Sequence, residues 1–197
     1  MIRPIACFLK YDSLNNWRNI RLKGFKMTKY VILFLSMVIA IGLSASLSQA
    51  QTGEPRLLAK YDDWDAYMFI ENGHKVCYMI SQPVDSQGEY SKRGEIYALI
   101  THRPAEGTRD VFSYITGYSY KVKSDASIKV DNNEFSLFTQ NETAWAYDAK
   151  SDKSITDAIR NGSEMVVKGT SARGTLTTDH FSLKGSSKAY ARISSEC

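Results

Sequence analysis

Short strand-like segments separated by tight turns are the feature that most limits how this chain can fold. Two-residue alternation and aromatic residues mark two runs, Trp64–Ile70 and Lys75–Gln82, as expected of β-strands. Between them lies Asn72-Gly73, a pair that favours the two-residue turn of a β-hairpin because both residues tolerate positive φ. Strands joined by such turns run in opposite directions, so the pattern predicts an antiparallel sheet.

The same pattern recurs along the rest of the chain. Further predicted strands are Glu95–Arg103, Asp110–Gly117, Ala126–Val130, Glu134–Gln140, Thr143–Tyr147, Glu164–Gly169 and Thr175–Leu183. Turn sequences separate several of them, notably at 131–133 and 171–174. Many short strands with regular turn signals are typical of an all-β sandwich or barrel.

Two short helices are predicted within this all-β pattern. The first spans Ser154–Arg160, with Ser154 as its N-cap and Asn161-Gly162 as its C-terminal stop. The second spans Ser186–Ser195 and leads directly to Cys197. Their apolar faces are short, so we expect both helices to pack on the sheet.

The N-terminal segment has the layout of a secretory signal peptide. Basic residues precede the apolar run Tyr30–Leu43, and small residues follow as far as Ala50. We therefore predict cleavage between Ala50 and Gln51. The apolar run is shorter than the ~20 residues that span a bilayer, although a retained signal anchor is the alternative. Translation from Met1 or from Met27 fits the sequence equally well.

Removal of residues 1–50 changes the charge of the protein. This leader contains seven of the 25 Lys and Arg residues and one of the 21 Asp and Glu residues. The remainder, residues 51–197, therefore has 18 basic and 20 acidic residues, and its length suits one domain. A small negative net charge disfavours nucleic-acid binding, and no stable membrane anchor is expected after cleavage. We expect a periplasmic or secreted protein.

The number of cysteines that remain after cleavage agrees with export. Cys7 is lost with the leader, which leaves Cys77 and Cys197. An even number of cysteines in an oxidising compartment predicts a disulfide bond between them. Two free thiols in a reducing cytosol are the alternative.

Few residues that could carry out catalysis are present. The three histidines, His74, His102 and His180, have no zinc-binding spacing, and no serine follows the pattern of a nucleophile elbow. We therefore predict a protein that is not an enzyme and that uses no cofactor or metal. The alternative is a periplasmic hydrolase or small-molecule-binding protein that uses His102 or His180.

The C-terminal half resembles the invasion-associated locus B family, which is found in Gram-negative alphaproteobacteria. The most specific segment of this resemblance lies between Val166 and Gly185. The matching residues are Met165–Thr175, Thr177–Asp179 and Phe181–Gly185, with supporting matches at Val76-Cys77, Ser81–Pro83 and Thr101–Glu106.

The resemblance implies an exported immunoglobulin-like β-sandwich, periplasmic or surface-associated, in which Cys77 and Cys197 form a disulfide. The family is named for host-cell invasion and has no agreed catalytic residues, so the resemblance implies a binding protein of the bacterial envelope. Its partner is an unknown protein or envelope component, and its oligomeric state stays open.

Many members have a cysteine shortly after the first tryptophan; here Trp64 is followed by Asp65–Phe69 without one. A purely structural envelope component is a further alternative.

Overall fold

The computed structural model describes residues 53–197. The predicted signal segment 30–43 and the predicted cleavage site at Ala50 and Gln51 lie outside these residues. The described chain contains eleven β-strands, two α-helices and one 3-10 turn, η1 (Pro104–Glu106). Among the described residues, no helix combines the length and the apolar character needed to cross a bilayer.

The strands are short and follow one another closely in the sequence. They are β1 (Arg56–Tyr61), β2 (Trp64–Glu71), β3 (His74–Ser81), β4 (Asp85–Gly88), β5 (Tyr97–Arg103), β6 (Thr108–Ile115), β7 (Ala126–Val130), β8 (Asn133–Gln140), β9 (Thr143–Trp145), β10 (Glu164–Thr170) and β11 (Leu176–Ser182). All nine predicted strands are present. The predicted β2–β3 hairpin is confirmed, with positive φ at Asn72 (52°) and Gly73 (81°).

All eleven strands form one antiparallel sheet, in the order β1-β2-β3-β5-β6-β9-β8-β7-β10-β11-β4. The predicted antiparallel all-β character is therefore confirmed, whereas the predicted immunoglobulin-like sandwich of two separate sheets is wrong. The reason lies in β9. Trp145 of this three-residue strand pairs with Ser113 of β6 on one side and with Phe138 of β8 on the other, which makes the two halves continuous.

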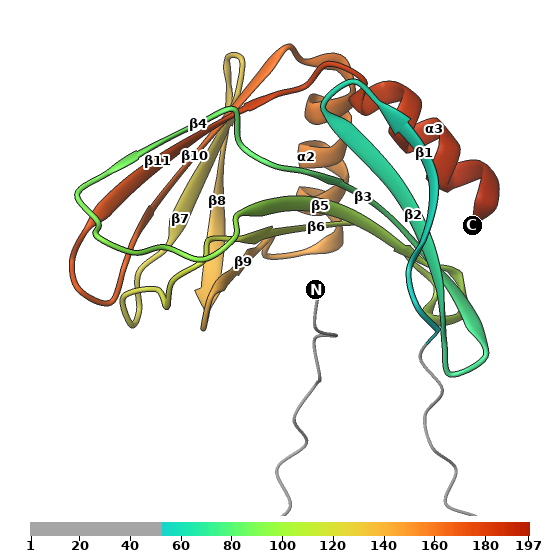
Figure 1. The fold of residues 1–197 in the computed structure, drawn as a ribbon, viewed down its shortest axis with the longest axis horizontal. Helices are drawn as coiled ribbons and strands as arrows, with labels where there is room; N and C mark the ends of the chain where they lie inside the picture. The colour runs from blue at the N-terminus through green and yellow to red at the C-terminus, as the bar shows by residue number, and fades with distance from the viewer. Residues whose placement is uncertain (1–52) are drawn as a thin grey trace, which may run out of the picture. The chain divides into compact units, whose positions relative to one another are not determined.

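The sheet curls until its two halves face each other (Figure 1). Strands β6 and β11 lie five positions apart in the sheet, which would separate them by about 24 Å if the sheet were flat. Nevertheless, the Tyr114 hydroxyl of β6 donates a hydrogen bond to Asp179 of β11. At the start of β2, Trp64 Nε1 likewise donates to the Ser182 carbonyl of β11 over 3.1 Å. The curled sheet therefore has a concave inner face and a convex outer face.

Two helices, α2 (Ala149–Asn161) and α3 (Ser186–Glu196), fill one end of the concave side (Figure 1). Helix α3 matches its predicted bounds to within one residue. Helix α2 begins earlier than predicted, because Asp148 is its N-cap and accepts a 2.7 Å hydrogen bond from the Ser151 N–H. The predicted cap, Ser154, lies inside the helix instead. At the other end of the curled sheet lies the hairpin between β10 and β11.

The core consists of the side chains that point from the strands into this concave side. They alternate along each strand with outward-pointing side chains, as the pleat requires. The helices contribute the apolar residues Ile155, Ile159, Ala189 and Ile193, all fully buried. The inward side chains of the sheet that are fully or almost fully buried include Trp64, Met79, Ile100, Phe112, Tyr114, Ile128, Leu137, Met165, Val167 and Phe181.

Candidate functional site

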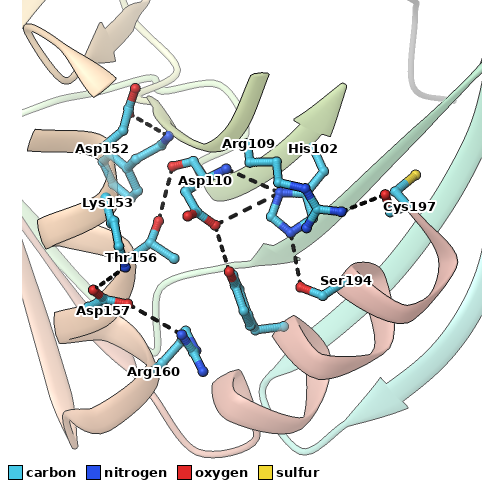
Figure 2. Close-up of polar contacts among 12 residues, drawn as sticks. His102, Arg109, Asp110, Asp152, Lys153, Thr156, Asp157, Arg160, Ser194 and Cys197 are labelled. Carbon is cyan, nitrogen blue, oxygen red and sulfur yellow. Dashed lines mark hydrogen bonds and ion pairs between the residues drawn. The ribbon is translucent and has the colours of Figure 1, made fainter. Parts of the chain in front are cut away.

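His102, a predicted candidate for catalysis, lies in the core beneath helix α3 (Figure 2). Its side chain is fully buried. Its Nδ1 accepts a 3.1 Å hydrogen bond from the Asp110 N–H, and its Nε2 lies 3.1 Å from Ser194 Oγ of α3. A histidine, a serine and an aspartate therefore do come together, which is the combination found in many hydrolases.

The hydrogen bonds give this histidine the wrong proton arrangement for a Ser-His-Asp triad. In a triad, the aspartate accepts a proton from Nδ1 and Nε2 accepts one from the serine. Here the Asp110 N–H donates to Nδ1, so the neutral ring carries its proton on Nε2 and donates to Ser194. Burial lowers the pKa of His102, with a smaller opposing effect from Asp110. This geometry argues against His102 as the base of a hydrolase.

The cluster around His102 instead joins both helices to the sheet. Asp110 has a φ of 62°, in the left-handed region. Its carboxylate accepts a 2.7 Å hydrogen bond from the Tyr190 hydroxyl of α3, and its carbonyl accepts a 3.0 Å bond from Thr156 of α2 (Figure 2). The Tyr190 ring also packs edge-on against His102, with 5.4 Å between ring centroids. These contacts give the cluster a structural role.

The disulfide between Cys77 and Cys197 lies beside this cluster, as the sequence predicted. The two Cα atoms are 6.0 Å apart. Cys77 of β3 pairs directly with His102 of β5, and Arg109 donates a 2.6 Å hydrogen bond to the main-chain oxygen of Cys197. The bond therefore fixes the C-terminal end of α3 to the sheet.

The burial of neutral His102 predicts a pH dependence of stability. Its pKa is lowered in the folded state relative to the unfolded value of ~6.5, so the unfolded chain binds a proton more readily. The free energy of unfolding should therefore fall as the pH drops below ~6.5 towards the folded pKa, by up to about 1.4 kcal/mol for each pH unit in that interval.

Urea unfolding at several pH values from 7 to 5 measures how the free energy of unfolding changes with pH. For one titrating group this slope is ~1.4 kcal/mol per pH unit at most. The variant His102→Gln cannot titrate, so its slope over this interval should be smaller than that of the wild type. His74→Gln, at the exposed start of β3, is the matched control for the loss of an imidazole. Equal slopes in wild type and His102→Gln would contradict the prediction.

The other two histidines lie apart from His102. His180 points outward from β11, next to the inward Asp179, and its Nδ1 lies 3.1 Å from Glu164 of β10. His74 is exposed at the start of β3. Within residues 53–197, no three His, Cys, Asp or Glu side chains are placed to hold a metal ion. The structure therefore does not combine the histidines into one site.

A pocket of about 530 Å³ opens at the end of the curled sheet that is remote from the helices. Three segments form its walls: 89–94, which follows β4; 117–119, which follows β6; and 171–177, which contains the β10–β11 turn. This volume lies within the range of ~300–1,000 Å³ that is usual for small-molecule sites. No pattern in the sequence indicated this pocket.

Arg93 forms the floor of the pocket. Its side chain is only 4% exposed, and it makes a bidentate ion pair with Asp179, with both N–O distances at 2.7 Å. Its Nε donates a 2.8 Å hydrogen bond to the Thr116 carbonyl. The rings of Tyr90 and Tyr118 lie 5.4 Å and 5.0 Å from the guanidinium carbon. The floor is therefore charged, buried and held in place from several sides.

The electrostatics of the floor keep each group in one protonation state. Burial alone would lower the pKa of Arg93, but its hydrogen bonds to Asp179 and the nearby charge raise it overall. Burial raises the pKa of the Tyr114 hydroxyl, and the negative charge of Asp179 raises it further. Arg93 thus stays charged and Tyr114 stays a hydrogen-bond donor to Asp179.

Two glycines bring the walls of the pocket together. The Gly94 N–H donates a 2.8 Å hydrogen bond to the Gly117 carbonyl. Gly117 has a φ of 73°, and a Cβ atom added there would lie 2.5 Å from the Gly94 carbonyl oxygen. The close approach therefore requires glycine, and it holds segment 89–94 next to segment 117–119.

A second candidate site lies on the convex side, opposite the core. Here the outward side chains of β2, β3, β5, β6, β9 and β8 include a set of partly exposed aromatic and aliphatic residues, which alternate with polar residues such as Thr101 and Ser113. We call this surface the outer apolar face. Its members are Tyr67, Tyr78, Ile80, Tyr97, Leu99, Val111, Ile115, Trp145 and Phe138.

Strand pairing arranges the members of the outer apolar face in rows that cross neighbouring strands. Ile80 pairs with Leu99, and on the far side of Ser113 the same row continues through Trp145 to Phe138. In the next row, Tyr67 stacks on Tyr78 with 5.3 Å between ring centroids. Both helices lie on the other side of the sheet, so no described element covers this face.

Comparison with known proteins agrees with this fold. A family model described as "Invasion associated locus B (IalB) protein" matches residues 64–194. The crystal structure of invasion associated protein B from Bartonella henselae is similar, with a TM-score of 0.51 and 19% sequence identity over 70% of this chain and 96% of that one. No curated protein matches the chain. The chain therefore belongs to the invasion associated locus B family.

Proposed function

We propose that this protein is exported to the bacterial envelope and acts there by binding another protein through the outer apolar face. The family is named for an association with invasion, and the signal-like leader supports export. A role in host contact or in maintenance of the envelope is consistent with both. Catalysis is not part of this proposal.

The observation that carries the proposal is the set of partly exposed aromatic and aliphatic side chains on the convex side. Soluble monomers rarely expose large contiguous apolar patches, and such patches usually mark an interaction site. Tyrosine, tryptophan and aliphatic residues are also common at the centre of protein interfaces. At the edge of the face, charged residues already pair with one another, as Arg103 does with Glu71 and Lys60 with Asp65. The face therefore suits an apolar partner better than a strongly charged one.

A periplasmic hydrolase that uses His102 or His180 is the alternative function. His102 is buried with its proton on the wrong nitrogen, and His180 lies on the convex side beside Glu164. Neither arrangement favours proton abstraction from a serine. The binding function is therefore the better supported of the two.

Photo-crosslinking in living cells tests the binding proposal. A photoreactive phenylalanine analogue replaces Tyr97 on the outer apolar face, or Lys168, which is exposed on the outward side of β10. We expect one specific crosslinked product from position 97 and none from position 168. The product should disappear when Leu99→Glu, which places a charge in the centre of the face, is added.

Circular dichroism of Leu99→Glu checks that the charged variant still folds. Val166→Glu, outward on β10 and away from the face, is the matched control and should leave the crosslink unchanged. Equal products from positions 97 and 168, or a product that survives Leu99→Glu in a folded protein, would refute binding through this face.

Cell fractionation tests the export part of the proposal separately. The protein should be found in the periplasmic or extracellular fraction with Gln51 as its first residue, which mass spectrometry of the N-terminal peptide detects. A product in the cytosol that keeps residues 1–50 would contradict export, whatever the crosslinking shows.

A further inference from the structure

We propose that the pocket above Arg93 binds a small anionic sugar, with the carboxylate or phosphate of the ligand placed between Lys92 and Arg173. This site is separate from the outer apolar face and is independent of the proposed protein partner. It would add a small-molecule ligand to a protein whose other surface suits a protein.

The charge of the pocket favours an anion. Lys92 and Arg173 both line it, are exposed and make no ion pair within the described part of the chain. Glu89 is the one acidic residue among the lining residues. Arg93 is already neutralised by Asp179, so the two exposed basic side chains are the ones free to meet a ligand. Charge-assisted hydrogen bonds from such groups to carboxylate or phosphate oxygens are the stronger kind.

Hydrogen-bond donors in the wall of the pocket favour a ligand rich in oxygen. Ser171 is buried in the wall, and its Oγ accepts a 3.1 Å hydrogen bond from the Thr175 N–H. Its own hydroxyl hydrogen is not used in that bond and can be donated to a ligand. The hydroxyls of Ser91 and Ser119 lie on exposed parts of the wall. A sugar, which presents several hydroxyl groups in a small volume, matches this lining.

The rigid floor explains how the pocket keeps its shape without a ligand. Replacing a buried ion pair with well-packed apolar residues is often neutral or stabilising, so the presence of this pair at the base of an open pocket is consistent with a polar site. The Arg93–Asp179 pair, with Tyr114 and the flanking rings of Tyr90 and Tyr118, holds segment 89–94 in place. Such preorganisation reduces the entropy lost on binding.

Isothermal titration calorimetry of the disulfide-bonded protein tests the proposal with four probes: glucuronate, glucose 6-phosphate, inorganic phosphate and glucose. We expect saturable binding of glucuronate or glucose 6-phosphate, and at least about tenfold weaker binding of glucose. Preference for glucuronate identifies a carboxylate ligand, and preference for glucose 6-phosphate a phosphate ligand. Added salt should weaken binding, because the basic side chains are exposed.

Two charge-removing variants locate the binding. Lys92→Gln and Arg173→Gln should each weaken binding by about tenfold. Lys168→Gln removes the same charge from the outward side of β10 and should leave the affinity within about twofold of the wild type. All three residues are exposed, so folding should be unaffected, which thermal unfolding checks.

Four results would overturn the proposal. One is the absence of saturable binding of both acidic sugars. Another is equal binding of glucose and the acidic sugars. The third is wild-type affinity in both Lys92→Gln and Arg173→Gln, since the anion would then lie elsewhere. Inorganic phosphate that binds as tightly as glucose 6-phosphate would also exclude a sugar site.

Discussion

Replacing Cys77 and Cys197 with alanine should lower the free energy of unfolding by about 4–5 kcal/mol. The bond closes a sequence separation of 120 residues, and the entropy that a crosslink removes from the unfolded chain grows with the length of the loop. The native state also depends on the bond, because helix α3 ends at the crosslinked residue. Without it, the buried residues Ala189 and Ile193 remain to hold the helix, together with the cluster around His102.

Urea unfolding followed by circular dichroism measures this effect. Wild-type protein treated with a reductant is the natural control and should unfold at the same urea concentration as the double variant. The variant alone should be insensitive to reductant. A loss of less than about 1 kcal/mol would contradict the prediction, since it would mean that the crosslink barely restricts the unfolded chain.

The second large effect is expected from Asp179→Asn. This change keeps the size of the side chain but removes the negative charge that faces Arg93, whose guanidinium is almost fully buried. Removing one partner of a buried ion pair leaves the other charge uncompensated and typically costs about 3–5 kcal/mol. The Tyr114 hydroxyl, which donates to the same carboxylate, loses its charged acceptor as well.

Chemical unfolding of Asp179→Asn measures the loss, and Asp85→Asn on the exposed edge strand β4 is the matched control, with an expected change within about 0.5 kcal/mol. The double variant Arg93→Met with Asp179→Leu should regain much of the loss, because it removes both charges together. An Asp179→Asn variant as stable as Asp85→Asn would show that the pair is more hydrated than its burial indicates.

Local patterns in the sequence predicted most of the secondary structure. The nine predicted strands exist, because alternation and turn signals act over a few residues. Strands β1 and β4 were missed for related reasons. β4 (Asp85–Gly88) has the composition of a turn, and β1 (Arg56–Tyr61) has no buried residue. Both are edge strands that gain their order by pairing with a neighbour, and a single strand does not show that pairing.

The order in which the strands pair could not be predicted from local sequence patterns. A sandwich and a curled sheet use the same strands and turns, and they differ only in which strands pair. The pairing of Trp145 with both Ser113 and Phe138 decides the outcome here. The Trp145–Phe138 pair belongs to a local hairpin, but the Trp145–Ser113 pair joins segments 32 residues apart, and no local signal marks it.

The candidate sites also depend on contacts that local sequence patterns do not reveal. His102 was identified by residue type, but its role depends on the Asp110 N–H and on Ser194, which approach it only in the folded chain. Arg93 was not identified, because Asp179 lies 86 residues away and the sheet must curl to bring them together. The contact between Gly94 and Gly117 joins residues that are 23 positions apart in the sequence, so it is no local signal for the pocket either.

The wide spacing of the two cysteines also sets an order of events during biogenesis. Cys77 is synthesised 120 residues before Cys197, so its thiol emerges long before a native partner exists. Throughout that interval α3 is missing, and β3 and β5 lack the helix that packs against them. Oxidation of this pair is therefore a late step, and under the proposed export it would follow the passage of Cys197 out of the cytosol.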